Sequence, residues 1–269
     1  NIWLKCGGML IAPQYVLTAA HCIQAADIDK DPIFRIGELC RGNIGNCGQH
    51  WEDRSVESII LLSNFTQADE GNDFALMRLT SPSTVTPVKI DSMALSQDYL
   101  AGKHLFVLGF GHDSFGGVDS NILKHVELDY VDDPTCAQTY PWLTSDMMCA
   151  ARAGEDACHN DSGGPLFDKE SNTVVGIISW GHECAKAGFP GVYSRIATEW
   201  SWIKEHICLN HNDPGPGFCT EFVSQSSPDN NPPLSIITAS DESGASNFEV
   251  FPSTFTLLCM LSFTRIFGS

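Results

Sequence analysis

The chemistry and the fold of this chain are decided by Asp156-Ala157-Cys158-His159-Asn160-Asp161-Ser162-Gly163-Gly164-Pro165-Leu166. A serine between an acid and two glycines can occupy a tight turn with its hydroxyl exposed. A lone hydroxyl is a poor nucleophile at neutral pH, because its pKa is far above 7. It needs a neighbouring base, and donors that hold the oxyanion formed during the reaction. The segment therefore predicts a catalytic serine if the rest of the chain supplies these groups.

Two upstream segments offer the missing groups. Leu17-Thr18-Ala19-Ala20-His21-Cys22 contains a histidine, and Asn72-Asp73-Phe74-Ala75-Leu76-Met77-Arg78-Leu79 begins a strand-like alternation with an aspartate. A lone histidine or aspartate is more often structural than catalytic. The order His21, Asp73, Ser162 is, however, one of the orders in which the Ser-His-Asp triad recurs. We predict that His21 takes the proton of Ser162 and that Asp73 fixes the His21 tautomer.

With these motifs the chain resembles the trypsin/chymotrypsin-like serine endopeptidases over about residues 3–207. The resemblance implies an all-β fold of two antiparallel six-stranded β-barrels, a C-terminal helix, and an active site in the cleft between the barrels. It places a protease domain at residues 1–208 and a disordered tail at 209–269. Within that domain we expect barrel 1 at about 1–88, barrel 2 at about 103–195 and the helix at about 198–207.

The chain begins at what looks like the second strand of the family, Ile2–Gly8, so we expect the first strand of barrel 1 to be missing. In the resembling enzymes a freed terminal amine pairs with the acid just before the serine, here Asp161. Losing one member of a buried ion pair costs about 3–5 kcal/mol. We therefore expect a zymogen-like, disordered pocket in this chain as it stands, and activity in the full-length protein.

The resemblance also locates a substrate pocket. Asp156 matches its floor, where an acid pairs with the cation of a substrate Arg or Lys. A serine at position 157 would add a hydroxyl for a lysine ammonium. Because Ala157 lacks that hydroxyl, we predict that Arg is favoured over Lys. The other substrate-binding residues are expected to be Ser179, Trp180, Gly181 and Gly191.

One position departs from the family pattern. The oxyanion hole of the family uses the N–H groups of the serine and of the residue at position 160, which is normally glycine. Here it is Asn160. Asparagine is among the residues that best tolerate unusual backbone angles, so the hole either forms with some strain or has a flipped peptide. Losing one oxyanion donor costs roughly 10²–10³ in rate.

Eleven cysteines indicate an oxidising compartment, and hence a secreted protein. Spacing alone does not fix their connectivity, but the resemblance implies three of the bonds. Zinc is the alternative for clustered cysteines, and we discount it because no Cys-x-x-Cys pair occurs. We expect Cys6–Cys22, Cys136–Cys149 and Cys158–Cys184 from the family, a local Cys40–Cys47 bond, a Cys208–Cys219 bond after the last helix, and an unpaired Cys259.

Charge and composition limit the partners. The 33 acidic and 15 basic residues give a net charge of −18, which argues against nucleic acid and favours basic peptides. Family members often bind calcium near Glu38, but the Gly/Asn-rich loop after Cys40 carries a second cysteine, so we expect no metal and no cofactor. The family default is a monomer.

The C-terminal tail carries the remaining signal. Its last part, Phe255–Phe267, is apolar but short, and Arg265 interrupts it. Small residues at 243–246 precede it and loosely match a GPI-attachment signal. We expect membrane attachment only if this is such a signal. The alternative is a tail translated from a poor gene model.

Two functions remain open at this point. The first is a secreted endopeptidase that hydrolyses polypeptides after Arg and Lys through an acyl-enzyme, and that protein inhibitors could block. The second is a non-catalytic homologue that binds peptides or proteins, as Asn160 and the missing start would allow. We favour the enzyme, because a homologue freed from catalysis need not keep His21, Asp73, Ser162 and Asp156.

Overall fold

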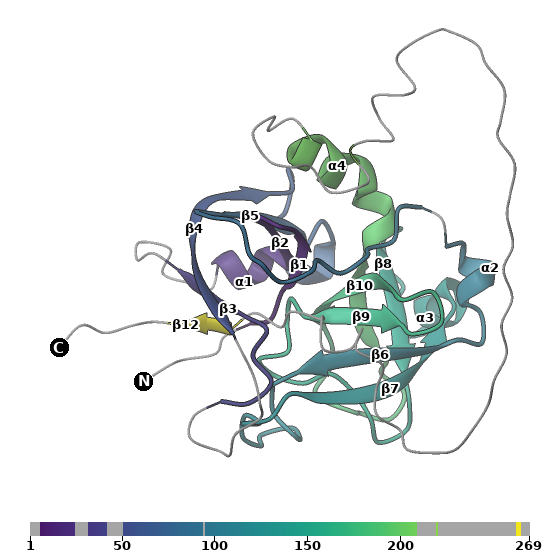
Figure 1. Cartoon of the computed structure of the whole chain (residues 1–269). Coiled ribbons are helices and arrows are strands. Elements are labelled where there is room, and N and C mark those ends of the chain that lie inside the picture. Colours follow the sequence, from purple (N-terminus) through teal and green to yellow (C-terminus); the bar gives the residue numbers. More distant parts are fainter. Residues whose placement is uncertain are drawn as a thin grey trace, which may run out of the picture.

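The structure is a computed structural model that describes residues 6–24, 32–41, 51–93, 95–208 and 219, and the backbone of 262–264. Its strands form two antiparallel units of six strands each (Figure 1). The predicted all-β fold class is confirmed. The second unit closes into a barrel, and the first is a six-stranded sheet.

The first sheet brings two of the predicted site segments together. Its strand order is β1-β2-β5-β4-β3-β12, and β2 pairs with β5 so that Thr18 faces Ala75. The end of β2 therefore lies beside the start of β5. The chain reaches His21 just after β2 and Asp73 just before β5. The strands are β1 Met9–Ala12, β2 Tyr15–Thr18, β3 Ile33–Ile36, β4 Glu52–Leu61, β5 Ala75–Leu79 and β12 Ser262–Thr264.

The closed barrel carries the serine and the pocket. Its order is β10-β11-β8-β7-β6-β9. Ser162 precedes β9, whose Pro165 pairs with Ile177 of β10, so the serine turn lies close to Ser179 at the end of β10. The strands are β6 His104–Gly109, β7 Lys124–Val131, β8 Met147–Ala151, β9 Pro165–Asp168, β10 Thr173–Trp180 and β11 Gly191–Arg195.

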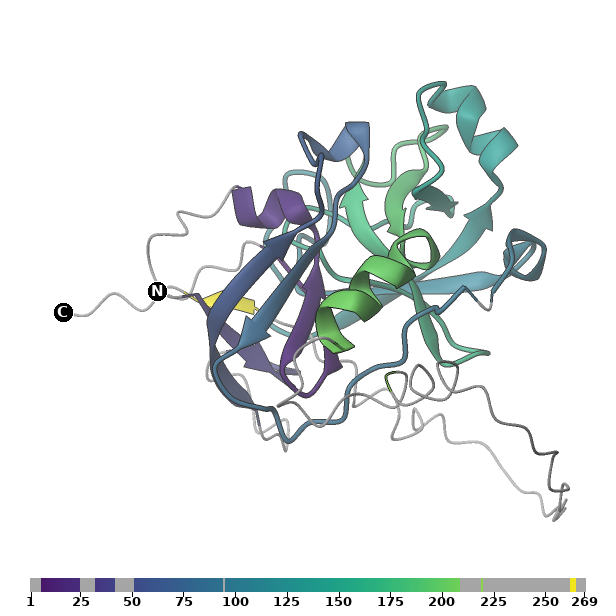
Figure 2. The same ribbon diagram turned by 90° about the horizontal axis from the view of Figure 1, so that it is seen from above.

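Short helices connect and cover the two units. The last of them, α4 Trp200–Cys208, lies over the junction between the sheets in both views (Figures 1 and 2). It follows a 3-10 turn, η2 Ile196–Glu199, and buries Ile203 and Ile207. The other helices are α1 Ala20–Gln24, the 3-10 turn η1 Ala68–Glu70, α2 Gln97–Leu100 and α3 Asp133–Thr139.

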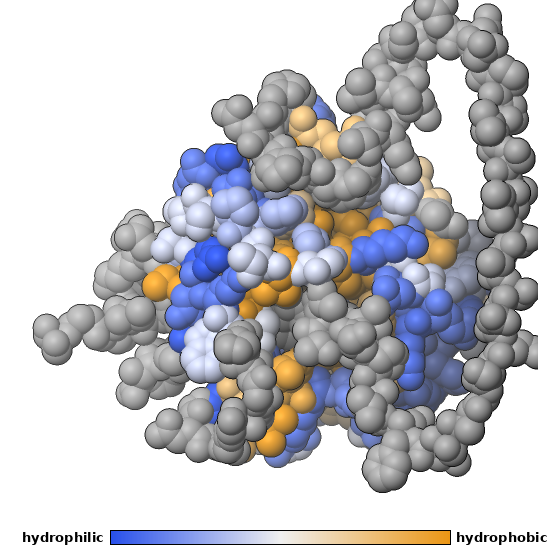
Figure 3. All heavy atoms as spheres, viewed as in Figure 1, coloured by the Kyte–Doolittle hydropathy of each residue, from blue (hydrophilic) through white to orange (hydrophobic). Residues whose placement is uncertain are grey.

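One hydrophobic cluster joins the two units. It contains Phe34 and Phe74 of the first unit, Phe167 and Ile177 of the barrel, and Ile203 of α4. In the space-filling view, hydrophobic residues show near the middle of the visible face and hydrophilic residues flank them (Figure 3). Protein interiors pack as densely as organic crystals, so this shared cluster fixes the site segments of the two units against each other.

The structure forms four of the expected disulfides: Cys6–Cys22, Cys136–Cys149, Cys158–Cys184 and Cys208–Cys219. Cys40 is also disulfide-bonded. Its expected partner Cys47, and Cys259, lie outside the described residues.

Most of the expectations for the two ends of the chain also lie outside the described residues, including the proposed GPI signal. Three residues of the tail form β12, which pairs antiparallel with β3. Among the helices that the structure describes, none has both the length and the apolar character needed to cross a membrane.

Candidate active site

His21 and Asp73 form a directly bonded pair. The ring Nδ1 of His21 lies 2.7 Å from Oδ2 of Asp73, and the backbone N–H of His21 donates to Oδ1 at 2.9 Å. The Asp73 side chain is 1% exposed, whereas the His21 ring is 26% exposed. A buried carboxylate bound to Nδ1 keeps the ring proton there, which leaves Nε2 able to accept a proton.

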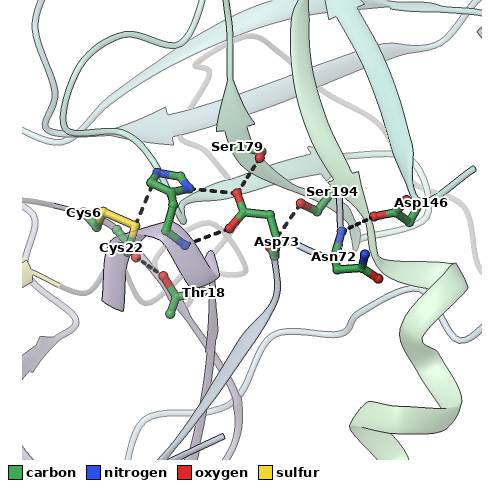
Figure 4. Close-up of polar contacts among 10 residues, drawn as sticks. Cys6, Thr18, Cys22, Asn72, Asp73, Asp146, Ser179 and Ser194 are labelled. Carbon is green, nitrogen blue, oxygen red and sulfur yellow. Dashed lines mark hydrogen bonds and ion pairs between the residues drawn. A yellow bond between two sulfur atoms is a disulfide. The ribbon is translucent and has the colours of Figure 1, made fainter. Parts of the chain in front are cut away.

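The barrel side of the molecule also holds Asp73. Ser179 of β10 donates its hydroxyl to Oδ2, and Ser194 of β11 donates to the backbone oxygen of Asp73 at 3.1 Å. Figure 4 shows Asp73 between these serines and the Cys6–Cys22 disulfide. A buried carboxylate is costly unless it is hydrogen-bonded. The donors on both units therefore fix Asp73 at their junction.

The neighbouring residue Asn72 adds a further link across the two units. Its backbone N–H donates to Oδ2 of Asp146 at 2.6 Å. Asn72 has a φ of 57°, in the left-handed region that asparagine tolerates. This turn directs the Asp73 side chain into the junction.

The serine turn packs against the segment that leads to His21. The backbone oxygen of Ser162 accepts a hydrogen bond from the N–H of Gly7 at 2.7 Å, and Thr18 donates its hydroxyl to the oxygen of Gly7. Gly163 has a φ of 79°, and a Cβ on it would lie 2.2 Å from Oγ1 of Thr18. Only glycine permits this close approach, which places Ser162 beside the segment that ends in His21.

The structure brings the three segments together but does not complete the triad. Within the described parts of the chain, no hydrogen bond joins Ser162 Oγ to His21 Nε2, and Nε2 lies 3.8 Å from Sγ of Cys22. Catalytic hydrogen bonds are often long in unliganded enzymes and shorten when substrate binds. The geometry is therefore a bonded His21–Asp73 pair, with the Ser162 backbone held against the segment that leads to His21.

A pocket of about 250 Å³ opens next to Ser162. All the substrate-binding residues predicted from the sequence line it, which are Asp156, Ala157, Ser179, Trp180, Gly181 and Gly191. Phe115, His159 and Glu183 line it as well, and were not among the predicted site residues.

Asp156 is the charged group of this pocket. Burial raises its pKa to about 6, although hydrogen bonds from the backbone N–H groups of Ala185 and Ala157 partly oppose that rise. The N–H of Ala185 donates to Oδ2 at 2.8 Å. A Cβ on Gly191 would lie 2.9 Å from Oδ1, so glycine keeps that oxygen accessible. A poorly solvated carboxylate in a cavity is suited to bind a cation.

The backbone at Asn160 lies in the left-handed region, with a φ of 72°. Among the described residues, no group accepts a hydrogen bond from the backbone N–H of Asn160 or of Ser162.

A sequence model of the family described as Trypsin matches residues 3–203. The chain belongs to the trypsin family. It is 34% identical over 207 residues to trypsin of Squalus acanthias, a match that covers 75% of this chain and 85% of the relative.

Two longer trypsin-family relatives match at similar identity. The chain is 33% identical to the proclotting enzyme of Tachypleus tridentatus, over 76% of this chain and 59% of the relative. It is also 33% identical to vitamin K-dependent protein C of Mus musculus, over 76% of this chain and 46% of the relative. The chain thus spans only about half the length of these two proteins.

For this trypsin-family chain, sequence reasoning missed the groups that act through long-range contacts. Ser194 and Asp146 hold the Asp73 segment, yet neither carries a local motif. Glu183 belongs to the pocket lining and was not predicted there. Its carboxylate pairs with Lys186 Nζ at 2.7 Å, which offsets its charge.

Metal ligation has little support in the described part of the chain. The one close group of ligand atoms there belongs to Cys6, His21 and Cys22, within 4.8 Å of one another. The two cysteines are joined in a disulfide and offer no thiolate. Glu38, at the loop where family members often bind calcium, accepts a hydrogen bond from Arg35 at 3.1 Å.

Proposed function

We propose that this trypsin-family protein is a secreted serine endopeptidase that cleaves polypeptides after Arg, and less readily after Lys. One observation carries the proposal. Asp156, a partly buried carboxylate, lines the same pocket as Ser162 and Ser179, and Ser179 bonds to Asp73 of the His21–Asp73 pair. A pocket that binds a cation and a hydroxyl with a nearby base together define a cleavage site.

Each residue has a defined step in this proposal. Ser162 Oγ attacks the substrate carbonyl carbon while Nε2 of His21 takes its proton, and Asp73 stabilises the imidazolium. The N–H groups of Asn160 and Ser162 bind the oxyanion. His21 then gives its proton to the leaving amine, which departs and leaves an acyl-enzyme. Water then attacks the acyl-enzyme while His21 takes its proton, and the carboxylic acid product is released from Ser162.

The pocket sets the specificity. A guanidinium or ammonium at the end of a long substrate side chain pairs with Asp156, and Gly181 and Gly191 leave room for that chain. Ala157 offers no hydroxyl to a compact ammonium. The two nitrogens of a guanidinium can instead bind a carboxylate in a bidentate way, so Arg is preferred.

The proposal includes an extracellular location and protein partners. Disulfides form in oxidising compartments, and four are present among the described residues. Polypeptide substrates and protein inhibitors are the expected partners, with the protein as a monomer. Anchoring to a membrane would require the tail to act as a GPI signal.

A fluorophosphonate probe tests the proposal on the activated protein, which is the full-length protein after proteolytic processing. We expect covalent labelling of Ser162, loss of labelling in Ser162→Ala, and faster cleavage of an Arg than of a matched Lys peptide. Thermal denaturation of the two proteins controls for folding. A folded protein that binds Arg peptides but is never labelled would instead be the non-catalytic homologue. Equal or faster cleavage after Lys would reject the Arg preference.

A further inference from the structure

Asp119 contacts the oxyanion side of the site although it lies far from Asn160 in the sequence. Its Oδ1 accepts a hydrogen bond from the side-chain amide of Asn160 at 2.8 Å. The same oxygen lies 3.5 Å from Nε2 of His112. The Asn160 side chain is therefore held by a hydrogen bond to a neighbouring loop.

The loop that carries Asp119 is closed at its base. His112 and Asp119 form an isolated β-bridge, and within the loop the N–H of Gly117 donates to the oxygen of Ser114. The N–H of Ser120, which follows, donates to the oxygen of Phe110 at 2.9 Å. These hydrogen bonds hold the loop, and with it the Asp119 carboxylate, in a fixed position.

The residues at the start of this loop also form hydrogen bonds with the residues on both sides of Asn160. The N–H of His112 donates to the oxygen of His159 at 2.9 Å, and the N–H of Gly111 donates to Oδ1 of Asp161 at 2.8 Å. Residues 159 and 161 are thus held directly, and Asn160 between them is held through its side chain.

The hydrogen bond between Asn160 and Asp119 can stabilise an unfavourable backbone conformation, because Asn160 has a φ of 72°. This left-handed conformation is unfavourable for most side chains, although asparagine adopts it more readily than others. A hydrogen bond to a carboxylate is stronger than one between neutral groups and stabilises this conformation. Glycine at this position would need no such support.

We propose that Asp119 is a positioning residue that holds Asn160 in the left-handed conformation, so that the Asn160 N–H faces the developing oxyanion. Asp119 does not touch the substrate; it acts only through Asn160. This inference rests on the proposed function and explains how a chain without glycine at this position retains an oxyanion hole.

A double-mutant cycle tests the proposal in the activated protein. We expect Asp119→Ala to lower kcat about tenfold, which is less than the 10²–10³ for complete loss of an oxyanion donor. In an Asn160→Gly background, the further change Asp119→Ala should alter kcat by less than about twofold, whatever the kcat of that background, because glycine needs no tether. Asp119→Asn keeps an acceptor oxygen and should recover most of the lost rate.

Inhibitor binding separates positioning from general damage. A peptide aldehyde ending in arginine adds to Ser162 and forms an oxyanion, so its Ki should rise about tenfold in Asp119→Ala. Benzamidine binds only the Asp156 pocket, so its Kd should change by less than about twofold. Thermal denaturation checks that each variant is folded. If Asp119→Ala does not fold, Asn160→Ala removes the same hydrogen bond and should give the same split between the two inhibitors.

Distinct outcomes overturn distinct claims. An unchanged kcat in Asp119→Ala, or an equal loss in the wild-type and Asn160→Gly backgrounds, would refute the positioning role. A folded wild-type protein without activity would refute the proposed function instead. In that case the NMR coupling that reports φ of Asn160 still tests the tether, because it should change in Asp119→Ala and not in Asp119→Asn.

Discussion

Two aspartates of one site, the buried Asp73 and the partly buried Asp156, differ in how many hydrogen bonds their carboxylates accept. Asp73 is 1% exposed and accepts hydrogen bonds from the backbone and ring of His21 and from Ser179. Asp156 accepts a bond from Ala185, and burial raises its pKa to about 6. A fully bonded carboxylate holds its neighbours in place, whereas an under-bonded one is ready to bind a cation.

The difference follows from where each residue lies. Asp73 enters β5 at the junction of the two units, and donors from both surround it. Asp156 lies in a loop at the pocket, where Gly191 removes any side chain that could cover its Oδ1. We therefore expect changes at the two aspartates to separate catalysis from substrate binding.

The largest expected effect comes from Asp73→Asn. The amide can hold the wrong His21 tautomer, so kcat should fall about 10⁴-fold, the size of loss seen when a triad carboxylate becomes an amide. Steady-state kinetics on an Arg peptide measures this change. Benzamidine affinity is the control, since the Asp156 pocket is untouched. A parallel loss of benzamidine binding would show that Asp73 supports the pocket as well.

A smaller effect, of a different kind, is expected from Asp156→Asn. A substrate cation would enter the pocket without its charged partner, and breaking a buried ion pair costs about 3–5 kcal/mol. The value of kcat/KM for an Arg peptide should fall by roughly 150- to 4,000-fold. The rate of fluorophosphonate labelling should change little, because that probe carries no cation. An equal loss in both assays would place Asp156 among the groups that support the catalytic serine.

The sequence predicts the residues that lie in local motifs, but not the distant residues that bond to them. His21, Asp73 and Ser162 could be found because each lies in a recognisable local motif, and the Thr18–Ala75 register explains why the first two meet. No local pattern indicates that Ser194 bonds to Asp73, because 121 residues separate the two and neither segment requires the contact.

The backbone conformation of Asn160 was likewise not predictable from the sequence. Sequence reasoning left open whether Asn160 would be strained or have a flipped peptide, since a residue type sets only a preference among backbone angles. The structure has a φ of 72° and a tether to Asp119, 41 residues away. Local chemistry thus predicted residues that line the pocket and residues that form the His21–Asp73 pair, whereas packing between distant segments determines how they are held.

The smallest expected effect is a pH dependence specific to Asp156. Its folded-state pKa, about 6, lies above the ordinary 3.8, so the folded protein takes up this proton more readily than the unfolded chain does. The contribution of Asp156 to folding stability should therefore be present below about pH 4 and be lost as the pH rises through about 6.

Cation binding by Asp156 has the opposite pH dependence, because it needs the ionised carboxylate. Benzamidine should bind about tenfold more weakly at pH 5 than at pH 7.5, as measured by calorimetry. In Asp156→Asn this dependence should disappear. If it persists there, another group governs the titration, and the pH dependence of benzamidine binding does not come from Asp156.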